Sequence, residues 1–219
     1  MKKSNSRFIY SGVFFLLFAV FTVLVKKVDV QPIGPEGSSV GFASINAKFF
    51  EIFGYNEFWY KFSERLGYAA LAVCACFGII GVIQLIKGKS LKAVDKKIIA
   101  LGVFYVVVIA FYVIFNKVVI NYRPVLEADG SLEASYPSSH TVLAVCVFVT
   151  MFSQKVFNRK GTTSEKAENV IAATILVAMM VLSRLFSGVH WFTDIVGGIL
   201  LSTALVHLYK AVASKIDGE

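Results

Sequence analysis

Arg184, His190 and Asp194 lie in the stretch 183–194, inside a segment that is otherwise apolar enough to cross a membrane. Charged groups at membrane depth are costly, so their presence there points to a functional role. On a helix, His190 and Asp194 would share one face because they are four residues apart. A carboxylate beside an imidazole fixes its tautomer and raises its basicity, which leaves the other ring nitrogen free to attack an electrophile. The alternative interpretation is a buried polar network that only joins two helices.

Three cations, Lys117, Arg123 and Arg184, are expected at or near membrane depth with few acidic residues to pair with them. Unpaired cations in a low-dielectric site are unstable without an anion, so the set predicts a phosphate-like ligand. Arginine offers a planar fork of donors to phosphate oxygens, and lysine adds a point charge.

The segment 137–140, with the sequence Pro-Ser-Ser-His, stands at the predicted start of a helix. Backbone N–H groups and the Ser138 hydroxyl at such a start would form a cradle for an anion. His190, supported by Asp194, is the expected nucleophile on phosphorus, and His140 is the expected acid that protonates the leaving oxygen. The cations would stabilise the transition state, and water would then hydrolyse the phospho-histidine.

The composition predicts the environment in which these residues act. Of the 219 residues, 57% are hydrophobic and only 16% are charged, where a soluble domain carries about a quarter. The chain is therefore expected to be an integral membrane protein with a single domain. Its net charge of +8 is attributed to basic cytoplasmic loops, and no nucleic acid partner is expected. Cys74, Cys76 and Cys146 lie in apolar runs and are expected as small core residues, without a disulfide or a metal site.

Six apolar segments predict an all-α fold with six transmembrane helices, at 8–25, 66–86, 98–115, 141–152, 170–182 and 191–209. The first could instead be a signal peptide, but Lys26 and Lys27 follow it rather than a small-residue cleavage pattern. The third helix is expected to end before Pro124, because proline disfavours helix at the preceding Arg123.

A short helix near 40–56 is expected to lie in the membrane interface, after a loop rich in proline and glycine at 28–39. It leads into an aromatic cluster at 49–62. This cluster could be a lateral doorway for a lipid or an ordinary aromatic belt, and the sequence leaves both open.

Six spans would place both termini and the loops at 87–97 and 153–169 on one side. That side holds 14 of the 22 Lys and Arg residues, so the positive-inside rule predicts that it is cytoplasmic. The constellations around Arg123, His140 and His190 would then all face outward, whereas five spans would divide them. We therefore predict a cell-membrane protein with cytoplasmic termini and an active site on the outer face.

These constellations resemble the three motifs of the type 2 phosphatidic acid phosphatase (PAP2) superfamily, which shares its catalytic core with vanadium haloperoxidases. The third motif is an S-R pair, five residues, His, three residues and Asp, and it is matched by Ser183, Arg184, His190 and Asp194. The second motif is P-S-G-H, and it is matched by Pro137, Ser138 and His140, with Ser139 at the glycine position.

The first motif of that superfamily is a lysine, six residues and an R-P pair, and this chain departs from it. Arg123 and Pro124 fit, but only five residues separate Lys117 from Arg123. Asn116 occupies the strict lysine position. Either the helix end shifts by one residue, or the lysine contact is replaced.

The resemblance implies a single PAP2-type domain over 1–219, with its motifs within 117–194. It implies hydrolysis of a lipid phosphate monoester or diphosphate, without a metal or cofactor, at the outer face of the membrane. Phosphatidic acid, phosphatidylglycerol phosphate and undecaprenyl diphosphate are the candidate substrates. A lipid phosphotransferase would use the same residues, and a non-catalytic lipid-binding protein on the same fold is a further alternative. A transporter is a weaker hypothesis because the sequence has no inverted repeat.

Overall fold

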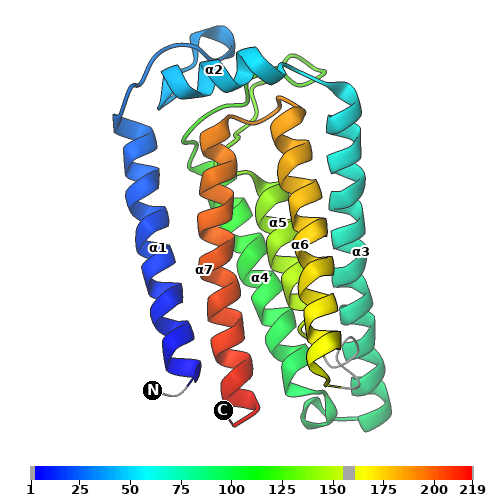
Figure 1. Cartoon of the computed structure of the whole chain (residues 1–219). Helices are drawn as coiled ribbons and strands as arrows, with labels where there is room; N and C mark the ends of the chain where they lie inside the picture. The colour runs from blue at the N-terminus through cyan, green and yellow to red at the C-terminus, as the bar shows by residue number, and fades with distance from the viewer. Residues whose placement is uncertain (1–2, 155–160, 219) are drawn as a thin grey trace.

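The computed structural model describes residues 3–154 and 161–218. Within them the chain forms helices and no named strand, in the order α1 (Lys3–Lys27), η1 (Pro35–Gly37), α2 (Ala43–Phe53), α3 (Glu57–Gly88), η2 (Leu91–Ala93), α4 (Lys96–Lys117), α5 (Ser139–Met151), α6 (Thr163–Phe186) and α7 (Phe192–Ile216). Six α-helices run lengthwise in one bundle, and α2 lies across one end of it (Figure 1). The expected all-α class is confirmed. Of the basic residues assigned to one side of the membrane, Lys2, Lys155, Arg159 and Lys160 lie outside the described residues.

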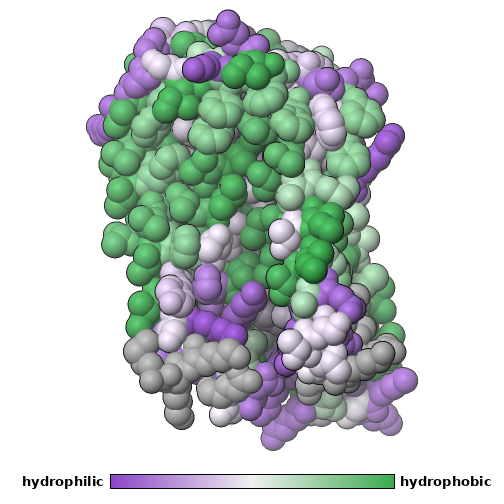
Figure 2. All heavy atoms as spheres, viewed as in Figure 1, coloured by the Kyte–Doolittle hydropathy of each residue, from purple (hydrophilic) through white to green (hydrophobic). Residues whose placement is uncertain are grey.

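Five of these helices, α1, α3, α4, α6 and α7, are long and apolar enough to cross a membrane. The remaining lengthwise helix, α5, has 13 residues, whereas a span needs about 20. Five of the six expected spans are thus confirmed by length and composition, and the count of six stays a prediction. On the face shown in Figure 2, apolar side chains cover the middle, and hydrophilic ones gather towards the two ends. This distribution is that of a multi-pass membrane protein.

Several helices extend beyond the expected spans, and α6 covers 163–186 rather than 170–182. Helix α3 begins at Glu57 rather than at 66, because the Asn56 side chain caps it by accepting a hydrogen bond from the Trp59 N–H at 3.2 Å. Helix α4 ends at Lys117, which is close to the expected end at 115 and before Pro124 as predicted. The β-branched run 118–120 (Val-Val-Ile) favours extended backbone, so the chain leaves the helix before the proline has any effect.

Helix α7 is the centre of the bundle, and more than half of its most apolar stretch is buried. Helix α1 packs along it at close range. Ser4 and Ser11 of α1 donate hydrogen bonds to the backbone carbonyls of Ala211 and Ala204 at 3.1 and 2.9 Å. Small side chains at these contacts let the two backbones approach closely, which is how helices associate in an apolar medium.

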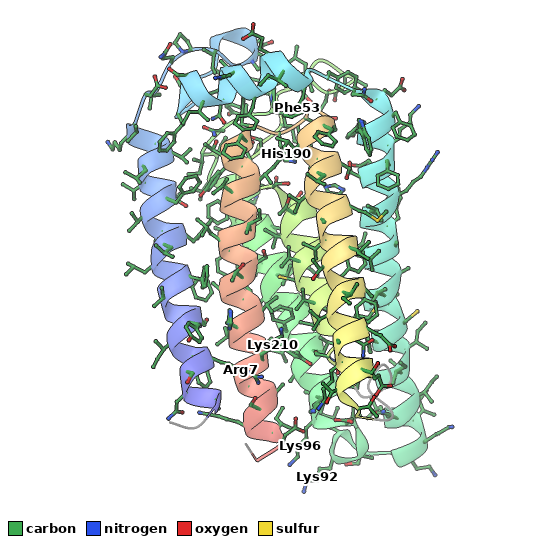
Figure 3. The ribbon with its side chains drawn as sticks, in the orientation of Figure 1. Arg7, Phe53, Lys92, Lys96, His190 and Lys210 are labelled. Atoms are coloured by element: carbon green, nitrogen blue, oxygen red, sulfur yellow. The ribbon has the colours of Figure 1, made fainter. Side chains whose placement is uncertain are left out.

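The two ends of the bundle differ in charge. Arg7, Lys92, Lys96 and Lys210 lie near the end that holds both termini, and His190 lies near the other end, below α2 (Figure 3). Arg7 donates hydrogen bonds to the Lys210 carbonyl at 2.9 Å and to the Ser214 hydroxyl. The structure therefore separates the basic end from the end that carries His190.

Helix α2 is tied to the start of α7 by a fully buried side chain, Asn46. Its carboxamide donates to the Thr193 hydroxyl at 2.9 Å and to the Gly41 carbonyl at 2.8 Å, and it accepts from the Thr193 N–H at 3.2 Å. Phe49 of α2 stacks on Phe192 with ring centroids 4.2 Å apart. A helix was expected near 40–56, and α2 covers 43–53; its place in the membrane interface stays a prediction.

Replacing Asn46 by alanine is expected to destabilise the fold by about 2 kcal/mol, because the Thr193 N–H and the Gly41 carbonyl would be left buried without a partner. Thermal unfolding in detergent should show a lower Tm for Asn46→Ala than for wild type. The matched control is Asn5→Ala, since Asn5 is exposed, and its Tm should not change. Equal Tm values for both variants would contradict the role given to Asn46.

Candidate active site

A cavity of about 550 Å³ lies between α3, α4, α5 and the connection 118–138. Its polar lining includes the charged or titratable side chains of Glu64, Arg123, Glu127, Glu133 and His140. Away from the connection 118–138, the parts of α3 and α4 that line the cavity are apolar. They include Leu71, Val108, Ile109 and Phe111. The cavity is therefore amphipathic, with its charged groups gathered near the connection 118–138.

His190 lies in the turn before α7, and Asp194 lies in the first turn of that helix. Their proximity therefore comes from the geometry of a helix start, and not from a shared helix face as the spacing had predicted. The His190 Nδ1 is 3.6 Å from the Asp194 Oδ2, which is longer than a hydrogen bond. Asp194 accepts closer bonds from the Trp191 N–H at 2.9 Å and from the Asn121 side chain at 3.2 Å.

The imidazole of His190 is buried, and neither ring nitrogen has a hydrogen-bond partner among the described residues. Burial lowers the pKa of His190 well below its usual value, and the nearby Arg184 and Arg123 cations act in the same direction. His190 is therefore held neutral, which is the form that has a lone pair for nucleophilic attack.

Arg184 of α6 is fully buried. Its Nη1 donates to the Ser63 hydroxyl and to the Glu64 carboxylate, both at 3.0 Å. Its Nε and Nη2 have no hydrogen-bond partner among the described residues. Buried donors without partners are rare in folded proteins, so Arg184 retains unused capacity to bind an anion.

Arg123 lies in the connection 118–138, where it pairs with two acidic residues. Its Nη1 is 2.7 Å from Glu127, and its Nη2 is 3.1 Å from Glu133. The expectation that these cations have few acidic partners was therefore wrong, for Arg123 as for Arg184. One partner, Glu64, is 120 residues from Arg184 in the sequence, and only the fold brings the two together.

The start of α5 was predicted correctly, because Ser138 is its N-cap and Ser139 its first residue. Ser138 is buried, and its hydroxyl accepts a hydrogen bond from Thr141 at 3.0 Å, while its N–H donates to the Asp194 carbonyl at 2.9 Å. Ser139 and His140 line the cavity. This helix start therefore joins the cavity wall to the turn that carries His190.

Lys117 is exposed and is not among the residues that line the cavity, whereas Asn116 is. Neighbouring residues on a helix point about 100° apart, so a shift of one residue turns the side chain at 117 well away from the direction of Asn116. The one-residue departure from the first motif therefore has a structural consequence. Of the predicted site residues, Arg123, Ser139 and His140 line the cavity. Arg184, His190 and Asp194 are buried and do not line it, although His190 lies close enough to Arg123, His140 and Arg184 to interact with their charges.

Sequence reasoning missed the contribution of α3. Glu64 contacts both Arg184 and His140, and a Cβ added to Gly67 would lie 2.9 Å from the His140 Nε2. Gly67 therefore gives the imidazole the room to pack against α3. The signal was present, since a carboxylate inside a membrane helix is functional by default, but a helix start placed at 66 left Glu64 outside the span.

A glycine also shapes the turn that carries His190. Gly188 has a φ of +63°, and a Cβ there would lie 1.8 Å from the Gly54 carbonyl oxygen. The Asn56 N–H donates to the Ser187 carbonyl at 3.0 Å across the same contact. The backbone of the α2–α3 junction thus packs directly on the turn between α6 and α7.

Protonation of Glu133 is expected to make stability depend on pH. Burial raises its pKa from an ordinary 4.5 to about 7, and Glu127 acts in the same direction. Between these two values the folded state binds a proton that the unfolded state releases, so stability should fall as pH rises through that window. The Tm of wild type should therefore decrease between pH 5 and pH 7.5, and Glu133→Gln should reduce that decrease.

The control for this titration is Asp129→Asn, in the same connection. Interactions with Ser131 lower the pKa of the exposed Asp129, so this group is already ionised throughout the window. The variant should keep the pH slope of wild type. An unchanged slope in Glu133→Gln would contradict the assignment.

Comparison with known proteins places these residues in a family. A model of the PAP2 superfamily matches residues 49–217. Phosphatidylglycerophosphatase B of Bacillus subtilis (strain 168) is 32% identical over 82 residues, which cover 37% of this chain and 40% of that protein. Lipid phosphate phosphatase delta of Arabidopsis thaliana is 28% identical over 92 residues, which cover 42% of this chain and 22% of that protein. The matched segments thus span less than half the length of either relative.

The fold is also similar to that of a solved protein, a transmembrane PAP2 type phosphatidylglycerolphosphate phosphatase from Bacillus subtilis. The two structures have a TM-score of 0.70 over 94% of this chain and 96% of the other, at 16% sequence identity. At this identity the likeness concerns the fold alone. The family match is independent of it and covers more than half of the chain, and it includes the segments that carry all three motifs. The resemblance seen in the motifs is confirmed, and this protein belongs to the PAP2 superfamily.

Proposed function

We propose that this protein is a membrane lipid phosphatase that hydrolyses a lipid phosphate monoester or diphosphate through a phospho-histidine. The observation that carries the proposal is the set of buried donors without partners, Nε and Nη2 of Arg184 and Nε of Arg123. They lie near a neutral His190 whose pKa both arginines lower. Positively charged donors around a neutral nucleophile are the arrangement that phosphoryl transfer requires.

The shape of the cavity supports a lipid as the substrate. Arg123 and His140 supply polar groups for a phosphate, and Leu71, Val108 and Ile109 supply an apolar wall for the hydrocarbon part. Burial of apolar surface along such a wall would add affinity roughly in proportion to the area covered. The names of the two relatives, a phosphatidylglycerophosphatase and a lipid phosphate phosphatase, support the same class.

In the first half of the proposed reaction, a ring nitrogen of His190 attacks phosphorus and the bond to the lipid oxygen breaks. Protonated His140 transfers its proton to that leaving oxygen, which departs as an alcohol or a shorter phosphate. Arg123 and Arg184 stabilise the charge on the remaining phosphate oxygens. Asp194 stabilises the positive charge that develops on the His190 ring.

In the second half, His140 accepts a proton from water, and the oxygen of that water attacks phosphorus. The bond between phosphorus and His190 breaks, which releases inorganic phosphate and restores both histidines. No step calls for a metal ion or a cofactor. An acceptor alcohol in place of this water would make the same site a phosphotransferase.

The separation of charge along the bundle supports an orientation in the membrane. Arg7, Lys92, Lys96 and Lys210 lie towards the end opposite His190 (Figure 3). The positive-inside rule assigns a basic end to the cytoplasm. The site would then open at the outer face, and both termini would be cytoplasmic.

Replacing His190 by alanine is expected to lower turnover by roughly 10³-fold or more, because the nucleophile is removed. The assay is release of inorganic phosphate from phosphatidic acid, phosphatidylglycerol phosphate and undecaprenyl diphosphate by detergent-purified protein. His207→Ala is the matched control, since His207 stacks on Phe14 of α1 with ring centroids 6.0 Å apart. It should keep wild-type activity. Retained activity in His190→Ala would remove His190 as the nucleophile.

The activity of wild type is expected to be the same in the presence and absence of EDTA, because charge stabilisation comes from arginine side chains. The same phosphate-release assay measures it, with and without added Mg²⁺. A strict requirement for Mg²⁺ would refute the mechanism as written.

A further inference from the structure

Helix α3 carries none of the three sequence motifs, yet one of its side chains contacts two of their residues. The Oε1 atom of Glu64 is 3.0 Å from Nη1 of Arg184 and 3.2 Å from Nε2 of His140. One carboxylate oxygen thus bridges a cation from α6 and an imidazole from α5. In the proposed reaction, these are the groups that bind a phosphate oxygen and protonate the leaving oxygen.

We propose, on the basis of that function, that Glu64 is a positioning residue that occupies the phosphate site of the free enzyme. Its carboxylate oxygen stands in for an oxygen of the substrate between Arg184 and His140. Binding of a phosphate requires Glu64 to release both groups and to turn towards the cavity that it lines.

The charge of Arg184 explains why a stand-in is needed. Its side chain is wholly inaccessible to solvent, and a buried guanidinium without a counter-charge would destabilise the fold. Glu64 supplies that charge and is itself 26% exposed, so it has open space into which it can move. The pair therefore keeps the empty site folded without making the carboxylate immovable.

The incomplete pairing of Arg184 explains why a phosphate can replace the carboxylate. Glu64 engages only Nη1, which also contacts Ser63. Nε and Nη2 remain without partners among the described residues. A phosphate group presents more oxygens and more negative charge than a carboxylate, so it can satisfy donors that Glu64 leaves unused.

The replacement of the Glu64 carboxylate by a phosphate also affects release of the product. Inorganic phosphate must compete with Glu64 for Arg184, just as the substrate does, but it lacks the hydrocarbon part that would hold a lipid in the cavity. Displacement of Glu64 lowers both affinities by the same factor, so the lipid stays bound through its hydrocarbon contacts while the free anion is left weakly bound. The role of Glu64 is therefore to assist release of the product.

The test is binding of orthovanadate, a phosphate mimic, to purified wild type, Glu64→Gln and Glu57→Gln. The glutamine keeps the size of residue 64 but removes its charge, and orthovanadate should bind about tenfold more tightly. Glu57 is the matched control, because it lies on the same helix and pairs with exposed Lys61 at 2.7 Å. Affinity is measured as the rise in Tm with orthovanadate concentration.

A stand-in and a merely structural contact predict opposite results. Both readings allow a lower Tm without ligand, so the affinity decides. If Glu64 only supports the fold, Glu64→Gln should bind orthovanadate no more tightly than wild type, which would overturn the proposal. If the glutamine variant fails to fold, Glu64→Asp retains the charge but withdraws it from His140. It should bind orthovanadate more tightly than wild type, and equal or weaker binding would overturn the proposal as well.

Binding of orthovanadate needs no turnover, so this test is separate from that of the proposed function. A wild type that hydrolyses none of the lipids would refute the phosphatase, whatever the affinity of Glu64→Gln. A wild type that hydrolyses them, while Glu64→Gln binds orthovanadate no more tightly, would refute only the role of Glu64.

Discussion

A guanidinium group buried inside a membrane bundle must be neutralised, and Arg184 meets this requirement through a partner on another helix. Glu64 lies 3.0 Å away on α3, and Ser63 completes the contact. Removal of either charge would leave the other in a medium that solvates it poorly. The α3–α6 packing and the placement of His140 beside Glu64 both depend on this ion pair, so one constraint links the fold to the site.

The second support of the site is the start of α7. Asn46 binds Thr193, Asp194 accepts from the Trp191 N–H, and the α2–α3 junction packs on Gly188. These contacts hold the turn that carries His190 from three sides. Because α7 is also the most buried of the spanning helices, the turn is attached to the best-packed of them, as a preorganised site requires.

Acidic side chains line the cavity and neutralise the arginines of the site. Glu127 and Glu133 pair with Arg123, and Glu64 pairs with Arg184. Each arginine still has at least one donor without a partner among the described residues. The carboxylates thus neutralise the two arginines and leave donors that the proposed phosphate would satisfy.

The sequence by itself determined the membrane class, the family and the polar residues that gather at one end of the bundle. These features are local, because apolar runs of a spanning length and fixed spacings such as His190 to Asp194 are visible without a fold. Only the tertiary structure decided which carboxylates neutralise Arg123 and Arg184, that Asn116 rather than Lys117 lines the cavity, and that Glu64 belongs to the site. Packing decides which residues distant in sequence become partners and which way a helix end points. Local sequence patterns do not predict packing.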